Sequence, residues 1–389
     1  MSEKRELRLG VIGVGSMGAV HAKDLLAGKV ERAKLVAVCD EDPEALARFP
    51  ELGQFASSRE LFASGAVDAV LIATPHFDHT PIAIDALGAG LHVLCEKPLG
   101  VHKADCLKMI AAYEARPKRE QVFAEMFNQR ADPRFIKLRE LIRSGELGAL
   151  RRMNWIITDW FRTETYYRSG GWRATWRGEG GGVLLNQCPH NLDLWQWLFG
   201  MPKRVHAFCG FGRFHEIEVE DQVTAYLDYD GGTTGVFVTT TGEAPGTNRL
   251  EVVGDMGKIV LDAEGLRFTK NEVSMMEFLK TSPERYTMPK ATTEFLTIAP
   301  GGPFHNVITQ NFVNAILDGE PLIAPAPEGL HSVELSNAMI YSGLTSNTIE
   351  LPLDAEAYAA ELARLVKDSR YVKPQIVRIE SDDMSGSFH

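Results

Sequence analysis

The residues with the densest chemistry lie between positions 180 and 193. His190 and Asp193 are three positions apart, so on a helix they share one face. A carboxylate beside an imidazole orients the ring, and an imidazole with a pKa of about 6.5 is suited to accept a proton near neutral pH. Asn186 joins this face only if the helix continues through Pro189 with a kink. We predict that His190 accepts a proton and that Asp193 orients it; the alternative is an ordinary helix start, with Asp193 at the positive end of the dipole.

Lys97 is a second candidate for proton transfer. The apolar run 92–95 leads into Glu96-Lys97-Pro98, and a proline favours an extended conformation for the residue before it. Lys97 is therefore expected at the carboxyl end of a parallel strand, where open α/β sheets bind ligands. Oxidation of a carbinol removes the hydroxyl proton as hydride leaves, and a nearby cation stabilises the developing alkoxide. The alternative is a solvated lysine on a loop.

A glycine-rich loop near the N-terminus indicates a dinucleotide site. The spacing G-x-G-x-x-G falls between an apolar run that begins at Leu7 and a helix-like segment, which suits a pyrophosphate held on a helix N-terminus. Asp40 ends the next apolar run, where a carboxylate accepts from ribose hydroxyls and repels a 2′-phosphate. These features predict NAD rather than NADP as the cofactor. The loop residues expected to contact it are Gly13, Gly15, Ser16, Met17 and Gly18.

The elements that must position these groups fall into two patterns. Residues 1–127 alternate short apolar runs with amphipathic helix-length segments, which predicts an α/β fold with a doubly wound parallel sheet that binds a dinucleotide. Residues 128–389 are predicted to form an α+β domain, because alternating β-type segments joined by Gly-containing turns indicate an antiparallel meander. Strands of the first domain are expected at Leu7–Val14, Leu35–Cys39, Val67–Ala73, His92–Cys95 and Gln121–Met126.

Composition and charge exclude several classes of protein. The chain has 389 residues, 44% of them hydrophobic, and a net charge of −11 without a basic cluster, so we expect no nucleic-acid partner. No apolar run approaches the roughly 20 residues of a membrane span, and we expect a cytoplasmic protein that binds no membrane. The histidines lack metal-ligand spacing, and no G-x-S-x-G motif is present, so neither a metal site nor a serine nucleophile is predicted.

Aromatic and arginine residues alternate between positions 155 and 177. Aromatic faces stack on the apolar faces of sugar rings, and guanidinium groups bind carboxylate or phosphate oxygens. This segment therefore predicts a pocket for a cyclic polyol or pyranoside. Some of these residues are equally expected in the core of the sheet or at an interface. The residues expected to contact the substrate are Lys97, Asn128, Tyr166, Trp172, Arg173, Asn186 and His190.

Taken in order along the chain, these motifs resemble one family. They are the glycine loop at 13–18, Ala73-Thr74-Pro75-His76 with His79, Glu96-Lys97-Pro98, and Gly180-Gly181-Gly182 leading to His190 and Asp193. Over nearly its whole length the chain resembles the glucose-fructose oxidoreductase and inositol dehydrogenase family of NAD(P)-dependent sugar oxidoreductases. In place of the aspartate that many members carry four residues before the histidine, this chain has Asn186, whose amide cannot act as a base.

The resemblance implies a Rossmann domain followed by an α+β domain for substrate binding and oligomerisation, and it also implies a catalytic group and a quaternary structure. Lys97, His190 and Asp193 would form the catalytic group, and which of Lys97 and His190 takes the proton stays open. The second domain would carry a large, mostly antiparallel open sheet that forms a homodimer or homotetramer contact. Trp172 and Arg173 would contact the nicotinamide or the substrate. The residues implied to line the cofactor crevice are Thr74, Pro75, His76, His79, Glu96 and Lys97.

Three functions are compatible with these motifs. The first is an NAD-dependent dehydrogenase that oxidises a secondary ring hydroxyl of a cyclic polyol, sugar or sugar derivative. The second is an NAD-dependent glycosidase that oxidises a ring carbon transiently, eliminates the aglycone and then reduces the intermediate. The third is a non-catalytic NAD-binding regulator, which would need the dinucleotide loop but neither Lys97 nor His190.

Overall fold

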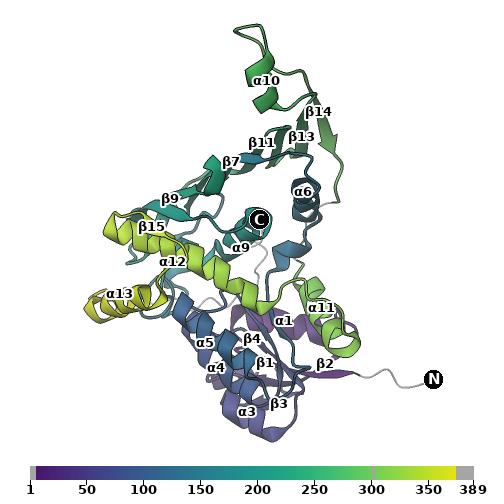
Figure 1. Cartoon of the computed structure of the whole chain (residues 1–389). Coiled ribbons are helices and arrows are strands. Elements are labelled where there is room, and N and C mark those ends of the chain that lie inside the picture. The colour runs from purple at the N-terminus through teal and green to yellow at the C-terminus, as the bar shows by residue number, and fades with distance from the viewer. Residues whose placement is uncertain (1–5, 300–301, 303, 374–389) are drawn as a thin grey trace, which may run out of the picture.

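The first half of the chain forms a parallel sheet at the base of the molecule in Figure 1. The computed structural model describes residues 6–299, 302 and 304–373, and within them this sheet has six strands in the order β3-β2-β1-β4-β5-β6. The order reverses between β1 and β4, which is the switch point where doubly wound sheets bind ligands. The strands are β1 Leu7–Ile12, β2 Ala33–Cys39, β3 Gly53–Phe55, β4 Ala69–Ile72, β5 His92–Cys95 and β6 Phe123–Glu125.

Helices cover both faces of this sheet, so its strands are apolar on both sides. All four residues of β4 are buried, as expected for a central parallel strand. The pattern did not predict β3, because a three-residue strand with Gly53 and Gln54 exposed carries almost no periodic signal. The helices of this half are α1 Ser16–Leu26, α2 Pro43–Leu46, α3 Ser58–Ser64, α4 His76–Gly88 and α5 Lys103–Glu114.

The second half builds a larger sheet, in the order β14-β13-β12-β11-β7-β10-β9-β8-β15 within the described residues. Every neighbouring pair is antiparallel except β7 and β10, which run parallel. The predicted fold class, a Rossmann domain followed by a mostly antiparallel open sheet, is confirmed. The strands are β7 Leu150–Ile157, β8 Arg204–Phe211, β9 Glu220–Asp228, β10 Thr234–Thr240, β11 Asn248–Gly254, β12 Gly257–Asp262, β13 Gly265–Asn271, β14 Ala291–Leu296 and β15 Ile349–Glu350.

Helices pack on one face of this second sheet. Trp195 on α9 meets Phe237 on β10, with ring centroids 5.9 Å apart, and α12 packs against β8 and α9. The other face carries exposed Ile156, Phe208 and Tyr226. Figure 1 shows α10 on a hairpin that projects from the sheet. The helices are α6 Pro133–Arg143, α7 Glu164–Arg168, α8 Val183–Asn186, α9 Pro189–Phe199, α10 Met275–Thr281, α11 His305–Asp318, α12 Gly329–Thr345 and α13 Ala355–Asp368, with 3-10 turns at Asn128–Ala131, Asp230–Gly232 and Ala326–Glu328.

One late helix packs with the first half of the chain. Ile308, Phe312 and Val313 of α11 join the apolar core formed by β1, β2 and α1. The division of the chain at residue 127 stays a prediction, because part of the later sequence contributes to the earlier core. Among the described residues, no helix has both the length and the apolar character that crossing a bilayer requires.

Candidate active site

A cavity of about 1410 Å³ lies at the carboxyl ends of β1, β4 and β5 and extends under α8 and α9. Its volume exceeds the roughly 300–1,000 Å³ of a pocket for one drug-sized ligand, which leaves room for a dinucleotide together with a second molecule. Gly18 and Asp193 are absent from its described lining. The other predicted site residues line it: Gly13, Gly15, Ser16, Met17, Asp40, Thr74, Pro75, His76, His79, Glu96, Lys97, Asn128, Tyr166, Trp172, Arg173, Asn186 and His190.

The glycine loop fits a dinucleotide. Gly13 has φ +81°, and a Cβ there would lie 2.7 Å from the Ala73 carbonyl oxygen. A Cβ at Gly18 would lie 1.7 Å from the Gly13 carbonyl oxygen, so this glycine serves the close packing of helix and strand. At Gly15 a Cβ would meet nothing within 4 Å, and no side chain caps the first turn of α1. The N-terminal N–H groups of α1 are therefore available to pyrophosphate oxygens.

Asp40 follows β2 and lines the cavity. Its carboxylate accepts hydrogen bonds from the backbone N–H groups of Val14, at 2.7 Å, and Asp42, at 2.9 Å. These bonds hold the carboxylate at the end of β2, and Glu41 and Asp42 add negative charge beside it. A 2′-phosphate would be repelled at this position, so these carboxylates fit NAD better than NADP.

The crevice beside β4 is built by Thr74, His76 and His79. The two ring nitrogens of His79 contact the carbonyl oxygens of Pro98, at 2.8 Å, and Thr74, at 2.9 Å, so this imidazole ties β4 to the turn after β5. His76 packs edge-on against Trp172 with ring centroids 5.2 Å apart. Burial lowers the pKa of His76 well below its ordinary value, so its ring is neutral at physiological pH.

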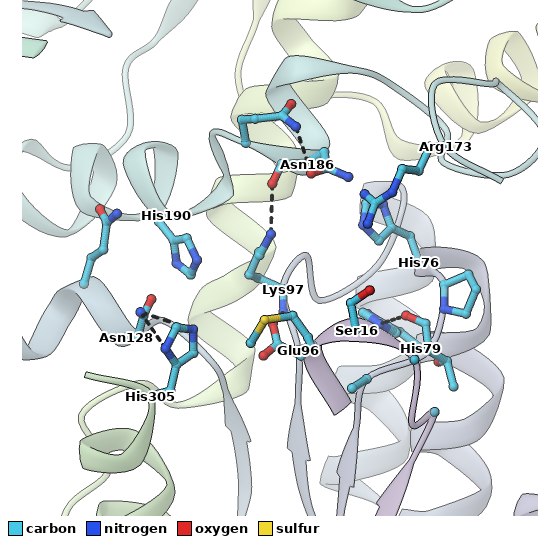
Figure 2. A pocket seen from close by; sticks show the side chains of 18 of the residues that line it. Ser16, His76, His79, Glu96, Lys97, Asn128, Arg173, Asn186, His190 and His305 are labelled. Carbon is cyan, nitrogen blue, oxygen red and sulfur yellow. Dashed lines mark hydrogen bonds between the residues drawn. The ribbon is translucent and has the colours of Figure 1, made fainter. Parts of the chain in front are cut away.

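Lys97 follows β5 and reaches across the cavity (Figure 2). Its Nζ donates to the backbone carbonyl of Asn186 at 2.9 Å. Burial lowers the pKa of Lys97, while the neighbouring Glu96 carboxylate opposes this shift. Burial alone would raise the pKa of Glu96, but a 2.8 Å contact with His21 brings it to about 2, so Glu96 stays ionised behind the lysine.

His190 lies near Lys97 in Figure 2, on α9. Burial and the nearby Lys97 charge lower the pKa of His190 well below its ordinary value, so the imidazole is neutral and able to accept a proton. Its Nδ1 has no hydrogen-bonding partner within the described part of the chain. Asn128 lies on the same side of the cavity, with its amide nitrogen 3.3 Å from Nε2 of His305.

The predicted pairing of Asp193 with His190 is wrong. Both residues are on α9, but the carboxylate of Asp193 accepts from Nε and Nη2 of Arg130 at 2.7 and 2.6 Å, and Asp193 is fully buried. Arg130 also donates to Glu328 at 2.5 Å. Asp193 therefore fixes α9 against the 3-10 turn after β6. Spacing could not reveal this, because Arg130 is 63 residues away and a long guanidinium outcompetes a neighbouring imidazole for a buried carboxylate.

The helix α8 ends at Asn186, and α9 begins at Pro189 after two residues that belong to neither helix. Asn186 and His190 therefore do not lie on one kinked helix. The side-chain oxygen of Asn186 accepts from Tyr166 Oη and from Gln187 Nε2, both at 3.0 Å, and its amide donates to Glu179. Glu179, which sequence reasoning missed, is 2% exposed. The side chain of Asn186 thus serves a protein network, while its backbone carbonyl binds Lys97.

Glu220 is a second buried acid that the sequence did not single out. Its two carboxylate oxygens accept from the N–H of Gly182 at 2.8 and 2.9 Å, and Oε1 also accepts from Leu184 at 3.1 Å. Burial raises the pKa of Glu220 to about 7. A Cβ at Gly182 would lie 1.9 Å from the Glu220 carbonyl oxygen, which explains the glycine at this position. Glu220 therefore sets the start of α8, whose last residue binds Lys97.

Tyr166 and Arg173 complete the wall above the cofactor crevice. Nη1 of Arg173 donates to Tyr166 Oη at 3.0 Å, and the guanidinium lies 4.8 Å from the Tyr166 ring and 4.6 Å from the Trp172 ring. Arg162 lies 5.2 Å from the Tyr166 ring. Tyr166 is therefore flanked by two cations, and the pocket offers guanidinium groups to an anionic ligand.

The fold and the site define the class of the chain as that of proteins with an NAD-binding Rossmann domain. Residues 7–124 match the family model described as "Oxidoreductase family, NAD-binding Rossmann fold", and residues 135–260 match the "GFO/IDH/MocA C-terminal domain". The chain belongs to the GFO/IDH/MocA family, which confirms the predicted glucose-fructose oxidoreductase and inositol dehydrogenase resemblance.

Individual relatives agree with this assignment. An inositol 2-dehydrogenase of Corynebacterium glutamicum is 31% identical over 232 residues, which are 58% of this chain and 61% of that protein. A myo-inositol 2-dehydrogenase of Thermotoga maritima is 28% identical over 267 residues, 66% of this chain and 75% of that one. The crystal structure of the WlbA dehydrogenase from Bordetella pertussis, in complex with NADH and UDP-GlcNAcA, superposes with a TM-score of 0.74 at 26% identity, over 90% of this chain and 100% of that chain.

Proposed function

We propose that this protein is an NAD-dependent dehydrogenase that oxidises a secondary ring hydroxyl of a cyclic polyol, sugar or sugar derivative. The observation that carries the proposal is the placement of Lys97 and neutral His190 on the wall of one cavity with the glycine loop. A regulator would need the loop alone. The names of the relatives, two inositol dehydrogenases and a dehydrogenase crystallised with a nucleotide-linked sugar acid, support the substrate class.

The chain's residues divide the proton chemistry between them. When bound, NAD supplies the hydride acceptor. His190 takes the hydroxyl proton, because burial keeps its imidazole neutral. The Lys97 ammonium donates one hydrogen bond to the Asn186 carbonyl and has two further N–H donors for the substrate oxygen, where negative charge develops. The flanking guanidinium groups of Arg162 and Arg173 orient the rest of the ligand.

The test is a panel of inositols, sugars, sugar acids and glycosides incubated with the purified protein and NAD. NADH formation equal to substrate loss is the expected result. Glycoside cleavage without NADH accumulation would replace the dehydrogenase with the redox-assisted glycosidase, and NAD binding without any turnover would contradict both enzymatic functions. The variant His190→Ala serves as the control: its NAD affinity should match the wild type while turnover collapses.

We also propose that a second copy of the chain covers the open face of the larger sheet. Ile156, Tyr226 and Phe208 are 38, 48 and 72% exposed there, which forms an apolar surface of the kind that monomers rarely leave in water. Light scattering coupled to gel filtration should give a dimer or tetramer. Phe208→Glu should shift it to smaller species, and a monomeric wild type would contradict the proposal.

A further inference from the structure

The segment after α13 runs onto the loop that carries Trp172 and Arg173. Ser369 Oγ donates to Glu218 Oε2 at 2.6 Å, and Tyr371 Oη donates to the Glu216 carbonyl at 2.5 Å. Two residues further on, Nζ of Lys373 donates to the carbonyl of Arg173 at 3.0 Å and to the carbonyl of Gly170. Residues 369–373, here called the C-terminal strap, are therefore hydrogen-bonded to the active-site loop.

The same loop receives little support from regular structure. Residues 169–182 contain neither helix nor strand, and Ala174 has φ +55°, a conformation that needs local restraint. The N–H of Ala174 donates to Glu179 Oε2 at 2.5 Å, and the N–H of Trp176 donates to Glu218 Oε1 at 2.8 Å. Glu218 thus binds the strap with one oxygen and the loop with the other.

Lys373 contributes charge as well as hydrogen bonds. Burial lowers its pKa to about 8, opposed by the Glu179 carboxylate and assisted by the Arg173 guanidinium. The two carbonyl groups that accept from Lys373 belong to Gly170 and Arg173, on either side of Trp172 in the chain. The ammonium group therefore links the backbone before Trp172 to the backbone after it. The side chains of Trp172 and Arg173 in turn line the cavity beside His76.

We propose that Lys373 is a positioning residue for the cofactor site: by binding the carbonyls of Gly170 and Arg173 it holds Trp172 and Arg173 at the geometry that binds NAD. This role rests on the proposed function. Lys373 is absent from the described lining of the cavity, so its removal should weaken cofactor binding more than it slows the hydride-transfer step. Loss of these two hydrogen bonds to the loop should weaken NAD binding about tenfold, which corresponds to about 1.4 kcal/mol.

The test measures NAD affinity by calorimetry, and KM and kcat, for full-length Lys373→Met, Lys373→Arg and the control Lys367→Met. Lys367 is exposed on α13 and carries a similar charge on a similar stem. We expect about tenfold weaker NAD binding in Lys373→Met, kcat at saturation within about threefold of wild type, recovery in Lys373→Arg, and no change in the control. In the wild type, NAD binding should weaken as pH rises through 8, and Lys373→Arg should lack this change.

Two results separate this inference from the proposed function. If wild-type protein binds no NAD, the proposed function fails and the positioning role fails with it. If wild type binds NAD and Lys373→Met binds it equally well, the positioning role alone is wrong. Equal losses in Lys373→Met and Lys367→Met would also overturn it, because the effect would then come from net charge rather than from the loop.

Discussion

Lys97 and His190 line the same cavity but are held in different ways. Lys97 follows a strand of the parallel sheet, so its place comes from the register of β5 with its neighbours β4 and β6. His190 lies on α9, which is fixed by the ion pair between Asp193 and Arg130. The short helix α8 precedes α9 in the chain, and its start is fixed by the hydrogen bond from Gly182 to Glu220. The first half thus positions its reacting group through backbone hydrogen bonds, and the second half through buried charged side chains. Substitution of these buried charged side chains should therefore alter the geometry of the site, although none of them is a reacting group.

The largest effect is expected at the reacting group of the first half. Lys97→Met should reduce kcat about 10³-fold, because the oxygen that loses its proton no longer has a cation beside it. NAD affinity, measured by calorimetry, should change by less than about fivefold, since the glycine loop is intact. Lys108→Met, on the exposed face of α5, is the matched control. A kcat within threefold of wild type would remove Lys97 from the catalytic group.

The next largest effect is expected on the stability of the protein when the buried ion pair between Arg130 and Asp193 is broken. Arg130→Met leaves the buried Asp193 carboxylate without its cation, which should lower the free energy of unfolding by about 3–5 kcal/mol. Urea denaturation measures it, with Arg143→Met at the exposed end of α6 as the control. The double variant Arg130→Met/Asp193→Leu should recover part of the loss, because it removes the unpaired charge as well. A loss below 1 kcal/mol for Arg130→Met would show that α9 does not depend on this ion pair.

A smaller effect concerns the pH dependence of Glu220. Its pKa is raised to about 7 in the folded protein from an ordinary 4.5, so the folded state binds a proton that the unfolded state has lost between pH 4.5 and 7. Through this group stability falls as pH rises across that window and stays level above it. Glu220→Gln keeps an acceptor for Gly182 but cannot ionise, so its stability relative to wild type should be higher at pH 8 than at pH 5 by about 1–3 kcal/mol. Urea unfolding at the two pH values measures this difference, and an equal pH dependence in the two proteins would refute it.

The smallest effect is expected on the preference for NAD over NADP, which tests the role of Asp40. Asp40→Ser should raise the ratio of NADP to NAD affinity about tenfold, because the variant removes the charge that repels a 2′-phosphate. Calorimetry with both dinucleotides measures the ratio. Glu51→Ser, at an exposed acid that is absent from the described lining of the cavity, is the control for a general change of charge. An unchanged ratio in Asp40→Ser would assign the preference to other side chains.

The amino-acid sequence by itself determined the parallel sheet, the glycine loop, Asp40 and the place of Lys97. Each depends on residues close together in the chain: an apolar run, a turn that only glycine fits, or a lysine before a proline at the end of a strand. The geometry of a parallel sheet then carries these local features to one edge. Predicted residues between Gly13 and Lys97 therefore line one cavity at that edge, where His190 joins them from the second half of the chain.

Only the tertiary structure decided the partners of the buried charges. Spacing assigned Asp193 to His190, but folding brings Arg130 to it from 63 residues away. Glu179, Glu220 and Lys373 carry no motif, because their roles depend on contacts with backbone or amide groups that any sequence would offer. The physical reason is desolvation: a buried carboxylate or ammonium is costly unless a counter-charge or a hydrogen-bonding partner lies beside it. Which group lies beside it depends on the whole fold.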